Sequence, residues 1–276
     1  MKNYTEELRS WLMNTPEFMR CIGYDQNNPH HSMTLDKHMQ AVEYYVEDVT
    51  DSEQLACAAL LHDIGKPVVA FTDKKTGFTR FFGHAGASAD IARELLLEGG
   101  CTDPFTYEVT WYIRHHDDFI SFKVGSVPEN HPFLRSVNVS TVAEALLKTA
   151  ITVEADAEID VNATVRFLFS LRVPSWGKMK PWNLQPDGLP PMSAFMNLMV
   201  LCRADTLAQA DTVYNPDGSV QTTKAEKLAV VDAIEKILPE AYALAENVYV
   251  TRLLKIAKEA VENITQTGKR KRTAGE

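Results

Sequence analysis

Apolar residues recur at helical spacing along most of the chain and predict a mainly α-helical protein. Between residues 52 and 64, Leu55, Ala58, Ala59 and His62 follow one another at i, i+3, i+4 and i+7, which predicts a helix with a core-facing stripe. Comparable stripes predict helices over 35–49, 104–117 and 195–208, and a further helix beginning at His84. Strands and helices do not alternate, so we expect no parallel sheet.

Two β-prone stretches interrupt the helical pattern. Residues 68–71 and 77–82 flank a turn-forming sequence, and residues 212–222 turn at Asn215-Pro216-Asp217-Gly218, whose proline and glycine positions suit a type I turn. The expected fold class is therefore all-α, a mainly helical bundle with one or two short β-hairpins.

The same patterns predict how the chain is organised. We expect an N-terminal helical extension (1–32), a core (33–211) with a Pro- and Trp-rich loop (174–191), a hairpin and C-terminal helices packed on the core (212–264), and a basic flexible tail (265–276). The loop could cover a site as a lid or pack on the core. The C-terminal helices are expected over 223–238 and 239–264, and the apolar stripe of the first suits a homodimer or an intramolecular contact equally.

Histidine and aspartate intrude on the apolar faces of these helices. The first case is His62-Asp63, where the histidine falls on the core-facing stripe, Gly65 is expected to end the helix, and Lys66 places a cation beside the pair. A buried histidine needs a partner, which could be a metal ion or a neighbouring hydrogen-bonding group.

The intrusion recurs at four further places along the chain. His38 borders one apolar stripe, His84 opens a helix, and the pair His115-His116 closes another. Asp205 lies within a hydrophobic run, where an unpaired carboxylate would cost several kcal/mol. Pairing with a cation removes much of that cost.

In their order along separate helices, His38, His62-Asp63 and Asp205 resemble the HD superfamily of metal-dependent phosphohydrolases. The segments 62–67, 82–89, 115–117 and 203–205 are similar to the HD domain attached to bacterial tRNA nucleotidyltransferases, the CCA-adding enzymes. The likeness covers about residues 33–211. Too few residues precede the first ligand for a nucleotidyltransferase head, so we expect a stand-alone version.

The resemblance implies a metal site and its ligands. His38, His62, Asp63 and Asp205 would hold one divalent ion, which could be Mn, Ni, Mg, Co or Fe. His84, His115 and His116 would face the same cavity and either bind a second metal or act as a phosphate clamp and general acid.

Two cations complete the expected catalytic set. Lys66 and Arg114 would bind the remaining phosphate charge or merely neutralise Asp63 and Asp117. The full expected catalytic set is Asp63, Lys66, His84, His115, His116 and Arg114.

Three functions follow from the resemblance. The first is a phosphohydrolase acting on nucleotides or RNA ends, such as a 2′,3′-cyclic phosphodiesterase or phosphatase. The second is a nucleotide phosphohydrolase acting on free nucleoside phosphates or cyclic signalling nucleotides. The third is a non-catalytic HD module that binds a nucleotide or a protein.

Composition and charge limit the kinds of molecule that the protein is expected to bind. A net charge of −9 argues against an extended duplex nucleic-acid surface but leaves room for a compact anion pocket. The N-terminus lacks an apolar signal region and no run of eighteen apolar residues occurs, so we expect a cytoplasmic protein with no membrane partner.

Several other side chains have structural interpretations. Four widely spaced cysteines suggest reduced core thiols. His30 and His31 lie in a loop-like stretch and are expected at the surface, whereas Trp11 and Phe18 are expected as core anchors.

Overall fold

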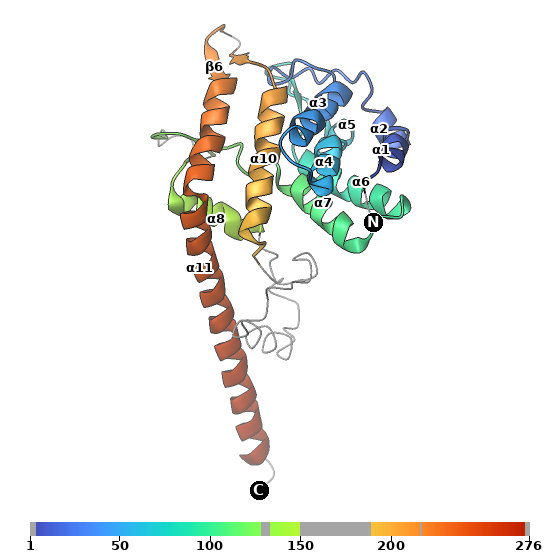
Figure 1. Ribbon diagram of the computed structural model, residues 1–276. Helices are drawn as coiled ribbons and strands as arrows, with labels where there is room; N and C mark the ends of the chain where they lie inside the picture. The colour runs from blue at the N-terminus through green and yellow to red at the C-terminus, as the bar shows by residue number, and fades with distance from the viewer. Residues whose placement is uncertain (1–3, 128–132, 150–188, 216, 274–276) are drawn as a thin grey trace.

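The computed structural model describes residues 4–127, 133–149, 189–215 and 217–273, and these residues form a mainly helical protein (Figure 1). The helices are α1 (Glu6–Met13), α2 (Pro16–Met19), α3 (Leu35–Glu47), α4 (Glu53–Leu61), α5 (Lys66–Val69), α6 (His84–Glu98), α7 (Asp103–His115), α8 (Val139–Thr149), α10 (Met192–Ala208) and α11 (Lys224–Thr273). The strands are β1 (Phe71–Thr72), β2 (Thr79–Arg80), β3 (Phe122–Lys123), β4 (Arg135–Ser136), β5 (Thr212–Tyr214) and β6 (Val220–Thr223). The expected fold class is confirmed.

Helix α4 lies at the centre of the core. The Ser52 hydroxyl accepts a hydrogen bond from the Leu55 N–H at 3.2 Å and caps the helix, and every residue from Leu55 to Leu61 is buried. Helices α3, α7 and α10 contact α4, and α6 packs against α7. A helix that is apolar on every side from Leu55 to Leu61 is stable only when other helices enclose it.

The end of α4 differs in one respect from the expectation. The helix stops at Leu61, and His62 and Asp63 lie in the turn that follows. Gly65 has an ordinary φ of −82°. A Cβ there would lie 2.5 Å from the Ser88 nitrogen, so glycine is needed for the close approach of α6 rather than for a left-handed helix end.

Within the described ranges, three short pairs of strands lie in the connections between helices. The antiparallel pair β1–β2 forms the first expected hairpin, although Val68 and Val69 belong to α5 rather than to a strand. The pair β5–β6 forms the second, with the Gly218 N–H donating to the Asn215 carbonyl at 2.9 Å. The third pair, β3 with β4, is parallel and was not expected.

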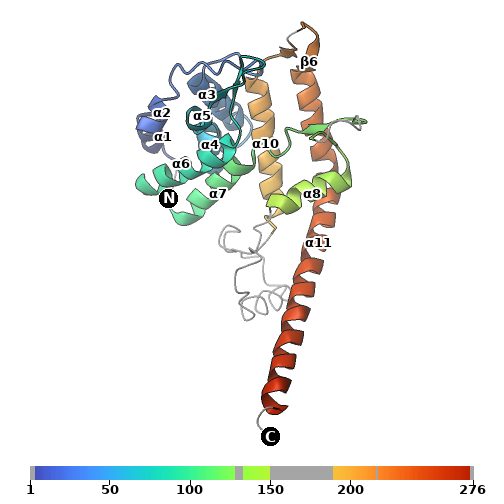
Figure 2. The same cartoon turned by 180° about the vertical axis from the view of Figure 1, so that it is seen from behind.

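Helix α11 is a single helix of 50 residues, not the expected two. Pro239 removes one backbone hydrogen bond, but it lies on an exposed face where water can satisfy the freed carbonyl. The first half packs against α8 and α10 and buries Val231, Ile234 and Leu238, so the apolar stripe serves an intramolecular contact. The second half extends beyond the other helices as far as Thr273, where a flexible tail was expected from 265 (Figure 2).

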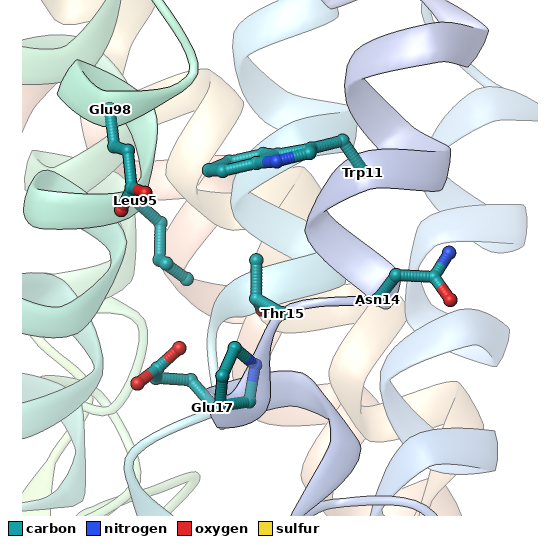
Figure 3. Close-up of a pocket in the computed structure, with 7 residues that line it drawn as sticks. Trp11, Asn14, Thr15, Glu17, Leu95 and Glu98 are labelled. Atoms are coloured by element: carbon teal, nitrogen blue, oxygen red, sulfur yellow. The ribbon is translucent and has the colours of Figure 1, made fainter.

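The N-terminal helices α1 and α2 cover one side of the bundle. Phe18 is fully buried as expected, but Trp11 is 37% exposed and is not a core anchor. Instead, its ring lines a surface pocket with Asn14, Thr15, Pro16, Glu17, Leu95 and Glu98 (Figure 3).

The remaining sequence expectations have mixed outcomes. The cysteines are free, and three of the four are buried: Cys21, Cys57 and Cys202. Most of the Pro- and Trp-rich loop, residues 174–188, lies outside the described residues. Within the described ranges, no helix has both the length and the apolar character required to cross a membrane.

Candidate metal centre

Three histidines are oriented by the same local device. The Nδ1 atom of His62 lies 2.8 Å from the Ala59 carbonyl, three residues earlier in the chain. His84 and His116 repeat the contact with the carbonyls of Phe81 and Ile113 at 2.9 and 2.7 Å. A carbonyl oxygen can only accept a hydrogen bond, so each Nδ1 is protonated. The Nε2 atom of each ring is then available to contact the other side chains of the cluster. Metal-binding histidines are commonly held in this way.

One part of the resulting cluster, here called the deep end, joins α3, α10 and the turn after α4. His38 Nε2 lies 3.0 Å from Asp205 Oδ1 and 3.4 Å from Asp63 Oδ2. His62 Nε2 lies 3.2 Å from Asp63 Oδ2 and 3.8 Å from Asp205 Oδ1. The side chains of His38, His62 and Asp63 are at most 2% exposed, and that of Asp205 is 14% exposed. The four residues singled out as ligands therefore meet in space.

The polar atoms at the deep end fit a divalent ion. Several are buried and, although they lie close to one another, form no hydrogen bond of good geometry: both ring nitrogens of His38, Nε2 of His62, Oδ1 of Asp63 and Oδ1 of Asp205. Buried polar atoms without partners are costly, and imidazole nitrogens with carboxylate oxygens are common ligands of first-row divalent ions. His38, His62 and Asp205 form one group that could hold such an ion, and Asp63 adjoins it.

The other part of the cluster, here called the open end, is built by the start of α6 and the end of α7. His84 Nε2 lies 3.1 Å from Asp63 Oδ1, 3.1 Å from Asp117 Oδ2 and 3.2 Å from His116 Nε2. The side chain of Asp117 is 30% exposed. His84, His116 and Asp117 form a second group that could hold a metal, and Asp63 touches both ends.

The carboxylates and histidines perturb one another strongly. Burial alone would lower the pKa of His38, but the adjacent carboxylates of Asp205 and Asp63 outweigh it and raise that pKa to about 9. Asp63 raises the pKa of His84 to about 9 against the same burial effect. Burial would raise the pKa of both carboxyls, yet neighbouring cationic groups and hydrogen bonds hold the pKa of Asp63 and of Asp205 well below the usual range. Burial lowers the pKa of His116.

Lys66 forms an ion pair with Asp63. Its Nζ atom lies 2.6 Å from Asp63 Oδ2, 3.0 Å from Gln26 Oε1 and 3.1 Å from His31 Nε2. The side chain is 4% exposed. Of the two roles that the sequence left open for Lys66, the geometry favours neutralising the carboxylate.

Two expected catalytic residues lie outside the cluster. The side chain of Arg114 is 49% exposed, and its guanidinium pairs with Asp90 of α6 at 2.6 Å, not with Asp117. His115 Nδ1 pairs with Asp118 at 2.7 Å, and its ring lies against Trp111. Adjacent residues on a helix point about 100° apart, so only His116 of the pair faces the cluster.

Sequence reasoning missed several contributors. His31 is not a surface residue, because its ring lies 4.8 Å from that of His38 and it contacts Lys66. His30 is half-buried rather than fully exposed, and this burial lowers its pKa to about 4. Asp117 could have been found, since it directly follows His115-His116.

A further contact links the centre to the C-terminal helix. The Gln209 amide donates to Asp205 Oδ2 at 2.9 Å, and Lys227 of α11 donates to Gln209 Oε1 at 2.6 Å. Lys227 Nζ also lies 3.2 Å from His30 Nδ1. No periodic pattern in the sequence signals this chain of contacts, because it joins a helix end to a residue beyond a hairpin.

Comparison with known protein families gives a match over the part of the chain that contains most of the cluster. A family model for the HD domain matches residues 35–157, and the expected HD domain is confirmed there. HD domains in general are metal-dependent phosphohydrolases. His38, His62 and Asp63 lie inside the matched region, whereas Asp205 lies beyond it.

Part of the chain is also similar to a characterised protein. The CC-adding tRNA nucleotidyltransferase of Thermus thermophilus is 31% identical over 104 residues, which are 37% of this chain and 24% of that protein. The chain thus spans about a quarter of the length of this relative.

Proposed function

We propose that this protein is a metal-dependent phosphohydrolase that cleaves phosphoester bonds of nucleotides or of RNA ends. The observation that carries the proposal is the deep end, where His38, His62, Asp63 and Asp205 converge and several of their buried nitrogens and oxygens form no hydrogen bond of good geometry. The HD match supports the hydrolase class. The relative's name refers to tRNA and to nucleotide transfer, which supports a substrate of this kind.

The deep end would hold the ion. When bound, a divalent ion supplies Lewis-acid chemistry, which activates water and offsets phosphate charge. His38, His62, Asp63 and Asp205 would hold it. The carbonyl of Ala59 fixes the ring of His62, and the amide of Gln209 fixes the carboxylate of Asp205.

The open end would supply the proton that the leaving oxygen takes up. Hydrolysis breaks one P–O bond, joins the water oxygen to phosphorus and transfers a proton to the departing oxygen. His84 Nε2 lies 3.1 Å from Oδ2 of Asp117, the more exposed of its two neighbouring carboxylates, which suits His84 as the general acid. His116, whose pKa burial lowers, stays neutral and keeps an acceptor facing His84.

Turnover by a substrate panel tests the proposal. Metal-stripped protein, with Mn²⁺, Ni²⁺ or Mg²⁺ restored in turn, is incubated with 2′,3′-cyclic nucleotides, RNA ends bearing that group, and nucleoside mono- and triphosphates. We expect metal-dependent cleavage that is lost in Asp63→Ala. Cleavage of cyclic or terminal phosphates would support the RNA-end substrate, and cleavage of free nucleotides alone would favour the nucleotide phosphohydrolase. Activity preserved in Asp63→Ala, or silence across the panel, would overturn the proposal.

A further inference from the structure

An exposed aromatic pair lies on the hairpin that connects α5 to α6. Phe82 is 78% exposed and Phe71 is 47% exposed, and their ring centroids are 5.6 Å apart. Val68, 61% exposed, belongs to the adjoining helix α5. Exposed apolar side chains scattered singly need no explanation, but rings held together on a surface frequently mark a binding site.

The pair is tied by the chain to both sides of Asp63. Phe82 precedes His84 by two residues, and Val68 follows Lys66 by two, while His84 and Lys66 both contact Asp63. Two residues span at most about 7 Å. Phe82, and Phe71 whose ring lies against it, therefore belong to the segment that leads into the cluster.

The hairpin is also held in place. The Asn27 side chain donates to the Gly77 carbonyl and the Asn28 side chain to the Thr79 carbonyl, each at 3.1 Å. Beneath the pair, Phe81 is buried with the Lys66 ammonium 5.3 Å from its ring centroid. The loop that carries His31, which contacts Lys66, is thus bonded to the hairpin that carries the exposed rings.

We infer that Phe71 and Phe82 form a stacking platform for the nucleobase of a substrate whose phosphate lies at the cluster. This inference rests on the proposed function. Flat exposed aromatic rings accept any base through its π-face, and such stacking is tolerant of sequence. A platform of this kind, beside a compact anion site in a chain of net charge −9, selects a single nucleotide or a terminal one rather than a duplex.

Binding of two probes that differ only in the base tests the platform. AMP and ribose 5-phosphate are titrated calorimetrically into full-length Mn²⁺-loaded protein that carries His84→Gln, which is expected to keep the metal and slow hydrolysis. We expect AMP to bind roughly tenfold or more tightly than ribose 5-phosphate, as one base–aromatic stack allows. Phe82→Ala should reduce AMP affinity to that of ribose 5-phosphate, and Phe82→Trp should restore the preference.

A matched control is available on α3, where Tyr44 is 66% exposed and lies against the Tyr45 ring. Tyr44→Ala should leave the preference for AMP unchanged. Equal binding of both probes, absent binding, or a preference that survives Phe82→Ala would overturn the platform. If the platform fails while metal-dependent cleavage persists, the proposed function stands. A preference that depends on Phe82 in a protein without cleavage would retain the platform and overturn the hydrolase.

Discussion

The deep and open ends of the histidine cluster contain the same residue types in different surroundings. At the deep end, His38 and His62 are enclosed and each lies near two carboxylates. At the open end, His84 is 13% exposed and its carboxylate Asp117 is 30% exposed. Enclosure favours permanent ligation, because unpartnered buried polar atoms are costly, whereas exposure allows a substrate and a proton to enter. The comparison suggests that the deep end holds the metal and the open end receives the substrate and the proton.

The largest expected effect comes from the residue that joins both ends. Asp63→Ala should abolish metal binding and turnover together, because Asp63 contacts histidines of the two ends and balances Lys66. Metal content and phosphate release are measured on the same preparation. Asp118→Ala, which removes a carboxylate outside the cluster, serves as the control and should retain both properties. An Asp63→Ala protein that still binds one ion tightly would contradict the shared role.

A change at the open end should separate chemistry from metal binding. In His84→Gln, we expect turnover to fall by about 10² to 10⁴-fold, the usual contribution of a general acid, with little change in metal affinity. Turnover is followed as phosphate release, and metal affinity by calorimetric titration. Loss of metal binding in this variant would instead make His84 a ligand and remove the distinction between the two ends.

A smaller effect is expected from the groups that hold Asp205. Gln209→Leu removes the amide that donates to Asp205 Oδ2, and Lys227→Met removes the ammonium that holds Gln209. Each should weaken metal affinity or activity by roughly 10- to 100-fold, as is usual for groups that orient a ligand. Lys224→Met, on the same helix but paired with Asp211, is the matched control. Equal effects of Lys224→Met and Lys227→Met would indicate a general loss of helix packing.

The smallest effect concerns the stability of the metal-free protein. Both His38 and His84 have their pKa raised from 6.5 to about 9 in the folded state, so their stabilisation is complete below pH 6.5 and is lost as the pH rises through 9. We expect the melting temperature of chelated protein to fall between these values. Bound metal requires neutral histidine, so the stabilisation by metal should grow over the same range. A melting temperature of chelated protein that rises with pH would contradict the assigned pairs.

Much of the fold could be predicted because burial imposes a helical period on the sequence. The stripes of α3, α4, α7 and α10 were evident, and the structure brings together the histidines and aspartates that interrupt them. The break expected at Pro239 does not occur, because packing against α8 and α10 on either side of an exposed proline outweighs one lost hydrogen bond.

The rest of the site could not be predicted, since it depends on geometry that no period encodes. At the end of α7, His115 and His116 are equivalent in sequence, and only the direction of the helix decides which one faces Asp63. His31 lies in an irregular loop, and Lys227 reaches His30 across 197 positions of sequence. Long-range contacts of this kind are fixed by the assembled fold alone.

The most direct test of the metal centre is anomalous diffraction from crystals of the protein grown with Mn²⁺. A strong peak within bonding distance of His38 Nε2, His62 Nε2 and the carboxylates of Asp63 and Asp205 is the predicted result. A peak confined to His84, His116 and Asp117, or no peak at the cluster, would contradict the assignment of the deep end as the metal site.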